Sequence, residues 1–433
     1  MSDSTKQSSQ TPWPESFDAL SNTVLESPYE FFCSLREHAP VYQIPGTNWF
    51  TVSRYQDVLD ITLNTDDFSS NLTSIIMNGP NGEPSELERP QLDSGPMDVL
   101  AIADPPAHKP QRRLAQKALS MRFVQSLEPI IRQQANDIID RFIDEGKCDW
   151  VQAFAKEIPM TISLALAGFP IQDWPEVKAW SDNAIALLSG INTPENFGTN
   201  VIAANAMWDY TEKHYQRIES ELGDNFTSSL IEATKDKQQP LLKREAISMI
   251  FQLLIAGSDS TANTIGNTVK MLAEDSDLQQ QLRTDPCLLT NFIEEVLRLE
   301  TPFMGHFRQT KKAVLVAGTT IPKGARLMLM WASANRDQTI FSQPNQIDLR
   351  RDLKAQKHFS FGYGIHNCLG AHLARTEIRL ALEELLNRTT SISIDNSKPL
   401  PDHIPSVFIR ELHHLPILFS ASGKNGSRTV DLE

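Results

Sequence analysis

The 433-residue chain lacks the features that identify several common classes of protein. Its four cysteines, Cys33, Cys148, Cys287 and Cys368, form no CxxC pair and have no regular spacing, so neither a zinc site nor a disulfide framework is indicated. Positive charge is also scarce. The net charge of −14 argues against a general nucleic-acid binder, because neutralising phosphates requires an excess of lysine and arginine.

Long hydrophobic runs are missing as well. The longest nearly apolar runs, Met249 to Gly257 and Leu164 to Phe169, are far shorter than the roughly 20 residues needed to span a bilayer. The N-terminal sequence MSDSTKQSSQTPWPESF has no basic region followed by an apolar core, so we expect no ordinary signal peptide. We therefore expect a cytoplasmic protein with no membrane anchor.

The chain is rich in helical periodicity. A helix is expected to start with Asp104 as its N-cap and Pro105 as its first residue. Further helical patterns cover 122–145, 149–168, 172–190, 200–222, 243–275, 277–284 and 289–300, and strand patterns cover 313–321, 326–331, 391–394 and 414–419, with a hairpin at 41–55. Residues 73–104 have no lasting period, which predicts a long loop of the kind that often covers a ligand.

One loop places Cys368 directly before a strongly periodic helix. It reads FGYGIHNCLG, from Phe361 to Gly370. A helix N-terminus offers unpaired N–H groups and the positive end of the macrodipole, and both should lower the pKa of a thiol. Gly362 and Gly364 remove side chains where a flat ligand would approach the backbone. A thiolate held there could bind a metal.

This loop resembles the haem-ligand loop of the cytochrome P450 family, F-x-x-G-x-H-x-C-x-G. Phe361, Gly364, His366, Cys368 and Gly370 match the pattern without departure. The resemblance implies a mainly α fold with small β-sheets, in which haem b lies between a long central helix and the cysteine loop, with Cys368 as the thiolate ligand of the iron. It covers residues 15–420 as a single domain and leaves 1–14 and 421–433 as tails that we expect to be disordered.

The expected long helix reads LLIAGSDSTANT in its middle, where glycine and several hydroxyl and acidic residues interrupt helix propensity. A close crossing with another helix would also explain these small residues. In the family, an A-G-x-D/E-T-T/S pattern lies over the oxygen-binding face of the haem. It matches here at Ala256, Gly257, Asp259 and Ser260, followed by Thr261, which implies that Asp259, Ser260 and Thr261 assist proton delivery. Ser260 replaces the usual threonine and lacks the methyl group that stiffens χ1.

Glu295 and Arg298 lie three residues apart in EEVLRLETP and can form an ion pair on one helix. By themselves they are typical of a surface bridge. The resemblance implies instead the structural E-x-x-R motif, with Arg351 as its third member; the neighbouring Arg350 is the alternative for that position.

His108 and Arg112 lie four residues apart and share one helical face. A solvated basic face is one interpretation of this pair. The resemblance implies a clamp for the two haem propionates, to which Arg308 and His366 would also contribute.

The segment from Asp104 to Arg122 carries a surplus of basic residues in an otherwise acidic chain. A plain solvated helix face would explain this surplus. The resemblance implies a landing site for an acidic ferredoxin, itself reduced by a ferredoxin reductase, because the chain has no flavin or iron–sulfur module of its own.

Substrate-facing residues are proposed by analogy with the family, and core packing is the alternative for each. They are Leu253, Ala256, Gly257, Phe303, Met304, Phe408 and Ile409. Their character implies an apolar, partly aromatic pocket, roofed by the loop 73–104.

The resemblance as a whole implies a monomeric haem-thiolate monooxygenase, an oxidoreductase that uses O₂ and electrons from NAD(P)H. It would hydroxylate a hydrophobic small molecule such as a terpenoid, steroid, fatty acid or aromatic compound. Two alternatives are a haem-thiolate enzyme that uses peroxide or does not oxygenate, and a haem- or ligand-binding protein without turnover. Retention of Asp259 beside an alcohol weighs against specialisation for peroxide.

Overall fold

The computed structural model describes residues 20–79, 83–89, 95–238 and 240–422. Its helices are α1 (Asn22–Glu26), α2 (Tyr29–His38), α3 (Tyr55–Leu63), α4 (His108–Ala118), α5 (Met121–Asp140), α6 (Glu157–Ala167), α7 (Trp174–Ala186), α8 (Pro194–Ser220), α9 (Phe226–Thr234), α10 (Lys243–Glu274), α11 (Ser276–Thr284), α12 (Leu289–Leu299), α13 (Trp331–Ala334) and α14 (Ala371–Arg388). The strands are β1 (Val41–Gln43), β2 (Trp49–Val52), β3 (Phe68–Ser69), β4 (Ser74–Asn78), β5 (Pro84–Glu88), β6 (Lys147–Asp149), β7 (His306–Thr310), β8 (Val314–Val316), β9 (Thr319–Ile321), β10 (Arg326–Leu329), β11 (Thr389–Ile394) and β12 (Pro416–Ala421). The expected tail 1–14 lies outside the described residues, as does the expected tail 421–433 beyond Ser422.

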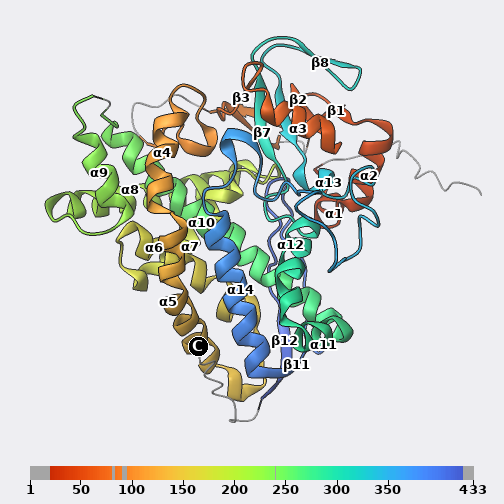
Figure 1. Cartoon of the computed structure of the whole chain (residues 1–433). Coiled ribbons are helices and arrows are strands. Elements are labelled where there is room, and N and C mark those ends of the chain that lie inside the picture. Colours follow the sequence, from red (N-terminus) through yellow and green to blue (C-terminus); the bar gives the residue numbers. More distant parts are fainter. Residues whose placement is uncertain (1–19, 80–82, 90–94, 239, 423–433) are drawn as a thin grey trace, which may run out of the picture.

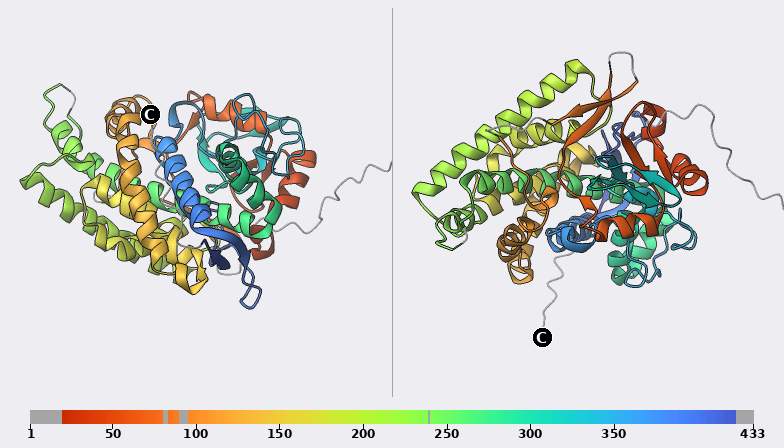
Figure 2. Two further views of the ribbon diagram at one scale, coloured as in Figure 1. Left: turned by 60° about the horizontal axis from the view of Figure 1, so that its bottom comes forward. Right: turned by 90° about the horizontal axis from the view of Figure 1, so that it is seen from above.

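Helices and sheet gather on opposite sides of the molecule. Figures 1 and 2 show α4 to α9 on one side and the sheet that contains β1, β2 and β7, with α1 to α3, on the other. Helices α10 and α14 lie between these two parts (Figure 1). None of the helices in the described ranges is long and apolar enough to cross a bilayer.

Helix α10 is the longest described element, with 32 residues, and it runs through the interior. It packs against α6, which is buried over almost its whole length. At Gly257 the two helices approach so closely that a Cβ atom would lie 2.7 Å from Ser163 Oγ of α6. The close crossing considered for the small residues of this helix therefore exists at Gly257.

Helix α14 follows the cysteine loop and carries a buried apolar stripe. Leu373, Ile378, Leu382 and Leu385 join a core cluster that also contains residues of α5 and α12. The helix begins at Ala371, later than the apolar pattern from Leu369 predicts. This packing fixes the position of the loop in front of it.

The larger sheet has the strand order β1-β2-β10-β7-β3. β1 and β2 form the hairpin predicted near the N-terminus, and β10 pairs parallel to β2 and antiparallel to β7. In this register Arg308 of β7 lies opposite Leu327 of β10. Because β7 is an interior strand, its backbone is fixed on both sides. A second sheet has the order β11-β12-β6.

Residues 73–104 differ from the long loop that the sequence predicts. They contain an antiparallel hairpin, with Ser74 of β4 opposite Glu88 of β5, and a turn of 3-10 helix at Leu100–Ile102. The second strand reads PSELE and has no apolar alternation, so hydrophobic periodicity could not reveal it.

Asp104 does not cap α4, which begins at His108. Its carboxylate accepts hydrogen bonds from Ser69 Oγ at 2.6 Å and from Ser70 N at 2.8 Å. The capping preference of aspartate is thus satisfied by a neighbouring segment instead of by the helix.

Candidate active site

The loop from Phe361 to Gly370 holds Cys368 in a tight turn. Cys368 N donates to Phe361 O at 2.8 Å, and Gly362 and Gly364 have φ values of 63° and 64°, where side chains are strained. The backbone N–H groups of Gly370 and Ala371 donate to the Cys368 sulfur. The first backbone donors of α14 are therefore directed at the sulfur, as the sequence predicts.

The net effect on the thiol pKa is opposite to the predicted one. Burial raises the pKa of Cys368, and this outweighs the lowering by the Gly370 and Ala371 N–H groups and by the cationic side chains of Arg112 and Arg375. The Cys368 side chain is exposed because it borders a cavity, and the protein atoms that surround this cavity still desolvate the thiol.

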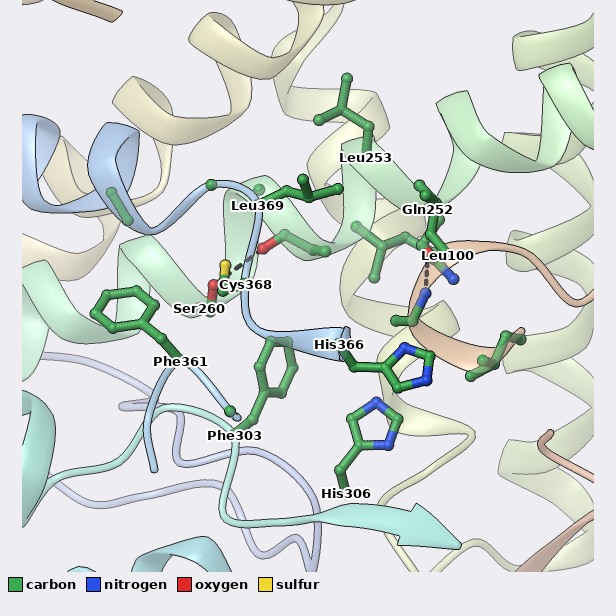
Figure 3. A pocket seen from close by; sticks show the side chains of 18 of the residues that line it. Leu100, Gln252, Leu253, Ser260, Phe303, His306, Phe361, His366, Cys368 and Leu369 are labelled. Atoms are coloured by element: carbon green, nitrogen blue, oxygen red, sulfur yellow. Dashed lines mark hydrogen bonds between the residues drawn. The ribbon is translucent and has the colours of Figure 1, made fainter. Parts of the chain in front are cut away.

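A cavity of about 420 Å³ opens in front of the Cys368 sulfur. Helix α10 forms the facing wall with Gly257, Ser260 and Thr261, and Figure 3 shows Ser260 and Cys368 bordering the same space. Ser260 Oγ donates to Ala256 O at 2.9 Å, one turn earlier in the helix. Its hydroxyl oxygen keeps its lone pairs available to the cavity.

Asp259 does not border this cavity, although its neighbour Ser260 does. Its buried carboxylate lies 2.8 Å from Lys178 Nζ and accepts a hydrogen bond from Ser181 Oγ at 2.7 Å, both on α7. Lys178 also pairs with Asp182. Burial raises the pKa of Asp259; the Asp259 and Asp182 carboxylates raise the pKa of Lys178 despite the opposing effect of burial. The two residues predicted on the oxygen side therefore occupy different places: Ser260 borders the cavity, and Asp259 belongs to an ion-pair network behind it.

The four residues predicted to bind propionates come from three elements that meet at one end of the cavity. The rings of His108 and His366 lie 4.4 Å apart, and Arg112, Arg308 and His366 border the cavity. Arg308 is 5% exposed and donates to Phe307 O at 2.7 Å, and no carboxylate among the described residues lies within ion-pair distance of it. Burial lowers the pKa of Arg308 to about 10. A buried cation without an anionic partner in the protein suits an anionic group of a ligand.

His306 is an additional residue of this cluster that the sequence reasoning missed. It borders the cavity and lies near His366 (Figure 3). Its Nδ1 accepts a hydrogen bond from Phe307 N at 2.9 Å, so the ring proton resides on Nε2. Burial, followed by the charge of Arg308, lowers the pKa of His306 to about 3. The period of two along a strand could have identified it, because His306 and Arg308 face the same side of β7.

Glu295, Arg298 and Arg351 form a buried network beneath the cysteine loop. Glu295 Oε1 lies 2.7 Å from Arg298 Nε and 3.0 Å from Arg351 Nε. Arg298 also donates to the carbonyl groups of Asn335, Pro344 and Gln346. Arg351 occupies the third position of the motif, and Arg350 is exposed. The pair is therefore not a surface bridge.

Of the residues proposed to face a substrate, Leu253, Ala256, Gly257, Phe303 and Phe408 border the cavity. Met304 and Ile409 do not, and both pack in a core cluster under the sheet. Phe303 and Ile409 form an antiparallel bridge, and Met304 N donates to Phe408 O at 2.8 Å. Phe303 and Phe408 meet at the cavity wall, where their ring centroids lie 5.0 Å apart.

The fold and the cysteine site match those of haem-thiolate proteins. The family model described as "Cytochrome P450" matches residues 194–286 and 287–413. Cytochrome P450 144 of Mycobacterium tuberculosis is 32% identical over 91% of this chain and 89% of its own length. The vitamin D(3) 25-hydroxylase of Pseudonocardia autotrophica is 29% identical over 94% of this chain and 97% of its own. The crystal structure of CYP109E1 from Bacillus megaterium in complex with testosterone superposes with a TM-score of 0.82, at 28% identity, over 92% of this chain and 99% of that one.

The chain belongs to the cytochrome P450 family. It is a monooxygenase with the P450 fold, and the family uses thiolate-ligated haem b. The cavity suits that group: Cys368 supplies a sulfur at its wall, and Arg308 is a buried cation with no carboxylate of the described residues within ion-pair distance. His366 Nδ1 is a further buried polar atom without a protein partner. Members of the family need redox partners.

Proposed function

We propose that this protein hydroxylates a neutral, hydrophobic small molecule, with electrons from NAD(P)H delivered by a separate ferredoxin and its reductase. The observation that carries the proposal is the apolar wall of the cavity on the side of α10 and of the segment 95–102. Met97, Leu100, Ile185, Leu188 and Leu253 are among its lining side chains. Such a surface binds ligands by removing apolar area from water.

The positions of the charged side chains at the cavity distinguish neutral from anionic substrates. The arginines that border the cavity are Arg112 and Arg308, and both lie at the end occupied by His366. On the α10 side, the polar lining side chains of Ser248 and Gln252 accept hydrogen bonds from backbone N–H groups of the segment 95–102. A carboxylate placed there would be desolvated without a cationic partner, which is costly. This favours a steroid or terpenoid over a fatty acid.

The compared proteins support a hydrophobic ligand. One relative is a vitamin D(3) 25-hydroxylase, and the compared crystal structure contains testosterone. Both names refer to molecules that are largely apolar and uncharged. We propose that the substrate of the present protein is likewise largely apolar and uncharged, and we do not propose that it is either of these two molecules.

In the proposed mechanism, Cys368 would hold the haem, and His108, Arg112, Arg308 and His366 would bind its propionates; when bound, this group would supply the activation of dioxygen. Phe361, the first residue of the ligand loop, and Gly257 on α10 also border the cavity and would help to hold that group. Ser260 Oγ, with Thr261 beside it, would hold a proton donor at the cavity wall. Its own proton is directed to Ala256 O, so its oxygen would accept a hydrogen bond from a water molecule and fix that proton donor at the cavity wall. Apolar side chains from α10 and the segment 95–102 would exclude bulk water.

Asp259 would supply protons to this wall indirectly. Its carboxylate is buried against Lys178, and Lys178 pairs with Asp182, which is nearer to solvent. The chain of ion pairs would connect the back of Ser260 with the surface through α7. Asp259 is therefore proposed as a positioning and relay residue that does not contact the substrate.

The proposed ferredoxin site is the exposed face of α4 and the residues that follow it. Lys109, Arg113, Lys117 and Arg122 are exposed, whereas Arg112 on the same helix borders the cavity. Helix α4 lies beside the loop that precedes α14 in Figures 1 and 2, so a partner bound there would be close to Cys368. Charge complementarity of this kind accelerates association.

The substrate proposal is tested with a ligand panel. Purified haem-loaded protein is titrated with a steroid, a terpenoid, an aromatic compound and a long-chain fatty acid, and displacement of the water ligand is followed by the Soret shift. We expect saturable shifts with neutral compounds and a weaker response to the fatty acid. A stronger response to the fatty acid would contradict the charge argument.

Turnover then separates the alternatives. With NAD(P)H, a ferredoxin and its reductase, the ligands that bind should yield hydroxylated products. Product formed only with added peroxide, or no product from any ligand that binds, would contradict the proposed reaction.

The partner proposal has its own test. Arg113→Glu and Lys117→Glu should slow reduction by an acidic ferredoxin at low ionic strength, with little effect on reduction by dithionite. Lys323→Glu, an exposed charge reversal outside α4, is the control. Equal slowing in the control would assign the effect to net charge.

A further inference from the structure

A cluster of metal-ligand side chains lies at the base of the loop near the C-terminus, outside the haem site. Asp402, His413 and His414 each offer one ligand atom, and these atoms lie within 4.8 Å of one another. The backbone holds them together, because His413 N donates to Asp402 O at 3.1 Å and Ile404 N donates to Glu411 O at 2.8 Å. The cluster therefore joins the two sides of a paired hairpin.

The tautomer of His414 can be assigned from its hydrogen bond. His414 Nε2 lies 3.2 Å from the carbonyl oxygen of Pro399. A carbonyl oxygen can only accept, so Nε2 carries the proton and, in the neutral ring, Nδ1 carries the lone pair. A hydrogen bond from the distal ring nitrogen to a carbonyl is the arrangement that orients metal-binding histidines.

That lone pair faces a carboxylate oxygen. Asp402 Oδ1 lies 3.2 Å from His414 Nδ1 and 3.9 Å from His413 Nδ1. The Oδ1 atom is shielded from solvent and has no hydrogen-bond partner, although the Asp402 side chain as a whole is 48% exposed. Asp402 Oδ1 and the two Nδ1 atoms can all accept, so none of them satisfies another. A single cation bound between them would satisfy all three.

We propose that Asp402, His413 and His414 bind one divalent transition-metal ion of the zinc type. Zn²⁺ bonds to imidazole nitrogen and carboxylate oxygen are about 2.0–2.2 Å long, so tetrahedral ligand atoms lie roughly 3.3 Å from each other. The Asp402–His414 distance already has this value, and His413 requires only a small side-chain adjustment, which its 68% exposure permits. Two imidazoles favour zinc, copper or nickel over magnesium or calcium. Water would complete the coordination.

The ion would stiffen the loop that contributes to the haem-side cavity. The hairpin between Asp402 and His413 carries Phe408 on its far turn, and Phe408 borders the cavity. His403, next to Asp402, contacts Asn267 of α10 through its ring at 3.1 Å. A metal that joins both sides of the hairpin base would restrict the motion of Phe408 and thereby affect ligand binding.

The direct test is a titration of the haem-loaded full-length protein, free of any polyhistidine tag, with Zn²⁺ by isothermal calorimetry. We expect one ion per chain, and binding at least about tenfold weaker in His414→Gln and in Asp402→Asn. His38→Gln is the matched control, since His38 also lies beside a carboxylate, Glu37, at 3.8 Å but belongs to no group of three potential metal ligands among the described residues. An unchanged Soret band verifies that each variant is folded.

Two further measurements distinguish a bound metal ion from a simple ion pair between Asp402 and His414. Electron paramagnetic resonance with Cu²⁺ should show coupling to two nitrogens, which His414→Gln reduces to one. Hydrogen exchange of residues 402–414 should slow when Zn²⁺ is added to the wild type and not when it is added to Asp402→Asn. Absence of stoichiometric binding, or equal binding by the three variants, would leave only the ion pair and overturn the proposal.

Discussion

At the residue scale, polar side chains at the cavity wall differ in whether the protein itself supplies their hydrogen-bond partners. Ser260 donates within its helix and can still accept from the cavity. Glu377, by contrast, is 2% exposed, borders the same cavity, and has an Oε2 atom without a hydrogen-bond partner. A residue like Ser260 can exchange protons with the cavity, whereas a buried polar group without a partner, like Glu377, reduces the stability of the fold.

Ser260→Ala should raise the release of peroxide relative to product, because it removes a hydroxyl from the proposed proton path. General acid–base groups contribute on the order of 10²–10⁴-fold to a step, and bridging water would compensate for part of the loss, so we expect a several-fold fall in product per NAD(P)H. Ser260→Thr is the matched variant: its methyl group restricts χ1 and should leave coupling equal or higher. Unchanged coupling in Ser260→Ala would remove Ser260 from the path.

Glu377→Gln should stabilise the protein at neutral pH. Burial raises the pKa of Glu377 well above its usual value, so an ionised carboxyl in the unfolded chain must take up a proton on folding. The free energy of unfolding is therefore highest below the pKa that Glu377 has in the unfolded chain. Above that pKa it falls by about 1.4 kcal/mol per pH unit, until the pH reaches the pKa of Glu377 in the folded protein. The gap between the thermal midpoints of variant and wild type should therefore widen from pH 5.5 to pH 8, and a constant gap would contradict this account.

At the scale of elements, two sets of polar contacts connect segments that lie far apart in the sequence. Beneath the cysteine loop, Glu295 of α12 pairs with Arg298 of the same helix and with the distant Arg351. Above the cavity, Ser248 and Gln252 of α10 accept hydrogen bonds from Met97 N and Ala101 N. The first set joins α12 to the segment that contains Arg351, and the second attaches the segment 95–102 to α10.

Arg351→Gln should destabilise the protein strongly, because breaking a buried ion pair costs about 3–5 kcal/mol. Arg350→Gln, the exposed neighbour, should change stability by no more than about 0.5 kcal/mol. The temperature at which the haem absorbance is lost measures both. Similar midpoints for the two variants would contradict the buried role of Arg351.

Gln252→Leu should loosen the segment 95–102 by removing the acceptor of Ala101 N. One hydrogen bond contributes about 1 kcal/mol, so the Ala101 amide should exchange about fivefold faster. Ser229→Ala, which removes a hydroxyl contact on α9, is the control. If the segment 95–102 exchanges at the wild-type rate in Gln252→Leu, the hydrogen bond from Ala101 does not hold the roof.

At the scale of the whole molecule, short motifs with strict spacing predict more than periodicity does. The motif around Cys368 predicts the family, the fold class and the cofactor, and the comparisons confirm all three. Helices α5, α10 and α12 lie near their predicted ranges because their apolar stripes face the core. Helix α9, which the sequence reasoning missed, reads FTSSLIEAT, and its serine and threonine residues have low helix propensity.

Other features depend on tertiary contacts that a single sequence does not contain. The hairpin in 73–104 is held by its partner strand and not by apolar alternation. Asp259 faces α7 because Lys178 lies there, a pairing between residues far apart in the chain. Phe303 and Phe408 meet at the cavity wall because an antiparallel bridge between Phe303 and Ile409 joins two segments that lie far apart in the chain.

The central claim is that Cys368 is the thiolate ligand of haem b, and the carbon monoxide difference spectrum of the reduced protein tests it most directly. The wild type should show the Soret shift typical of a thiolate ligand. Cys287→Ser, at an exposed cysteine, should retain this shift, and Cys368→Ser should lose it while haem content is measured separately. A thiolate-type shift that persists in Cys368→Ser, or is absent from the haem-loaded wild type, would contradict the account.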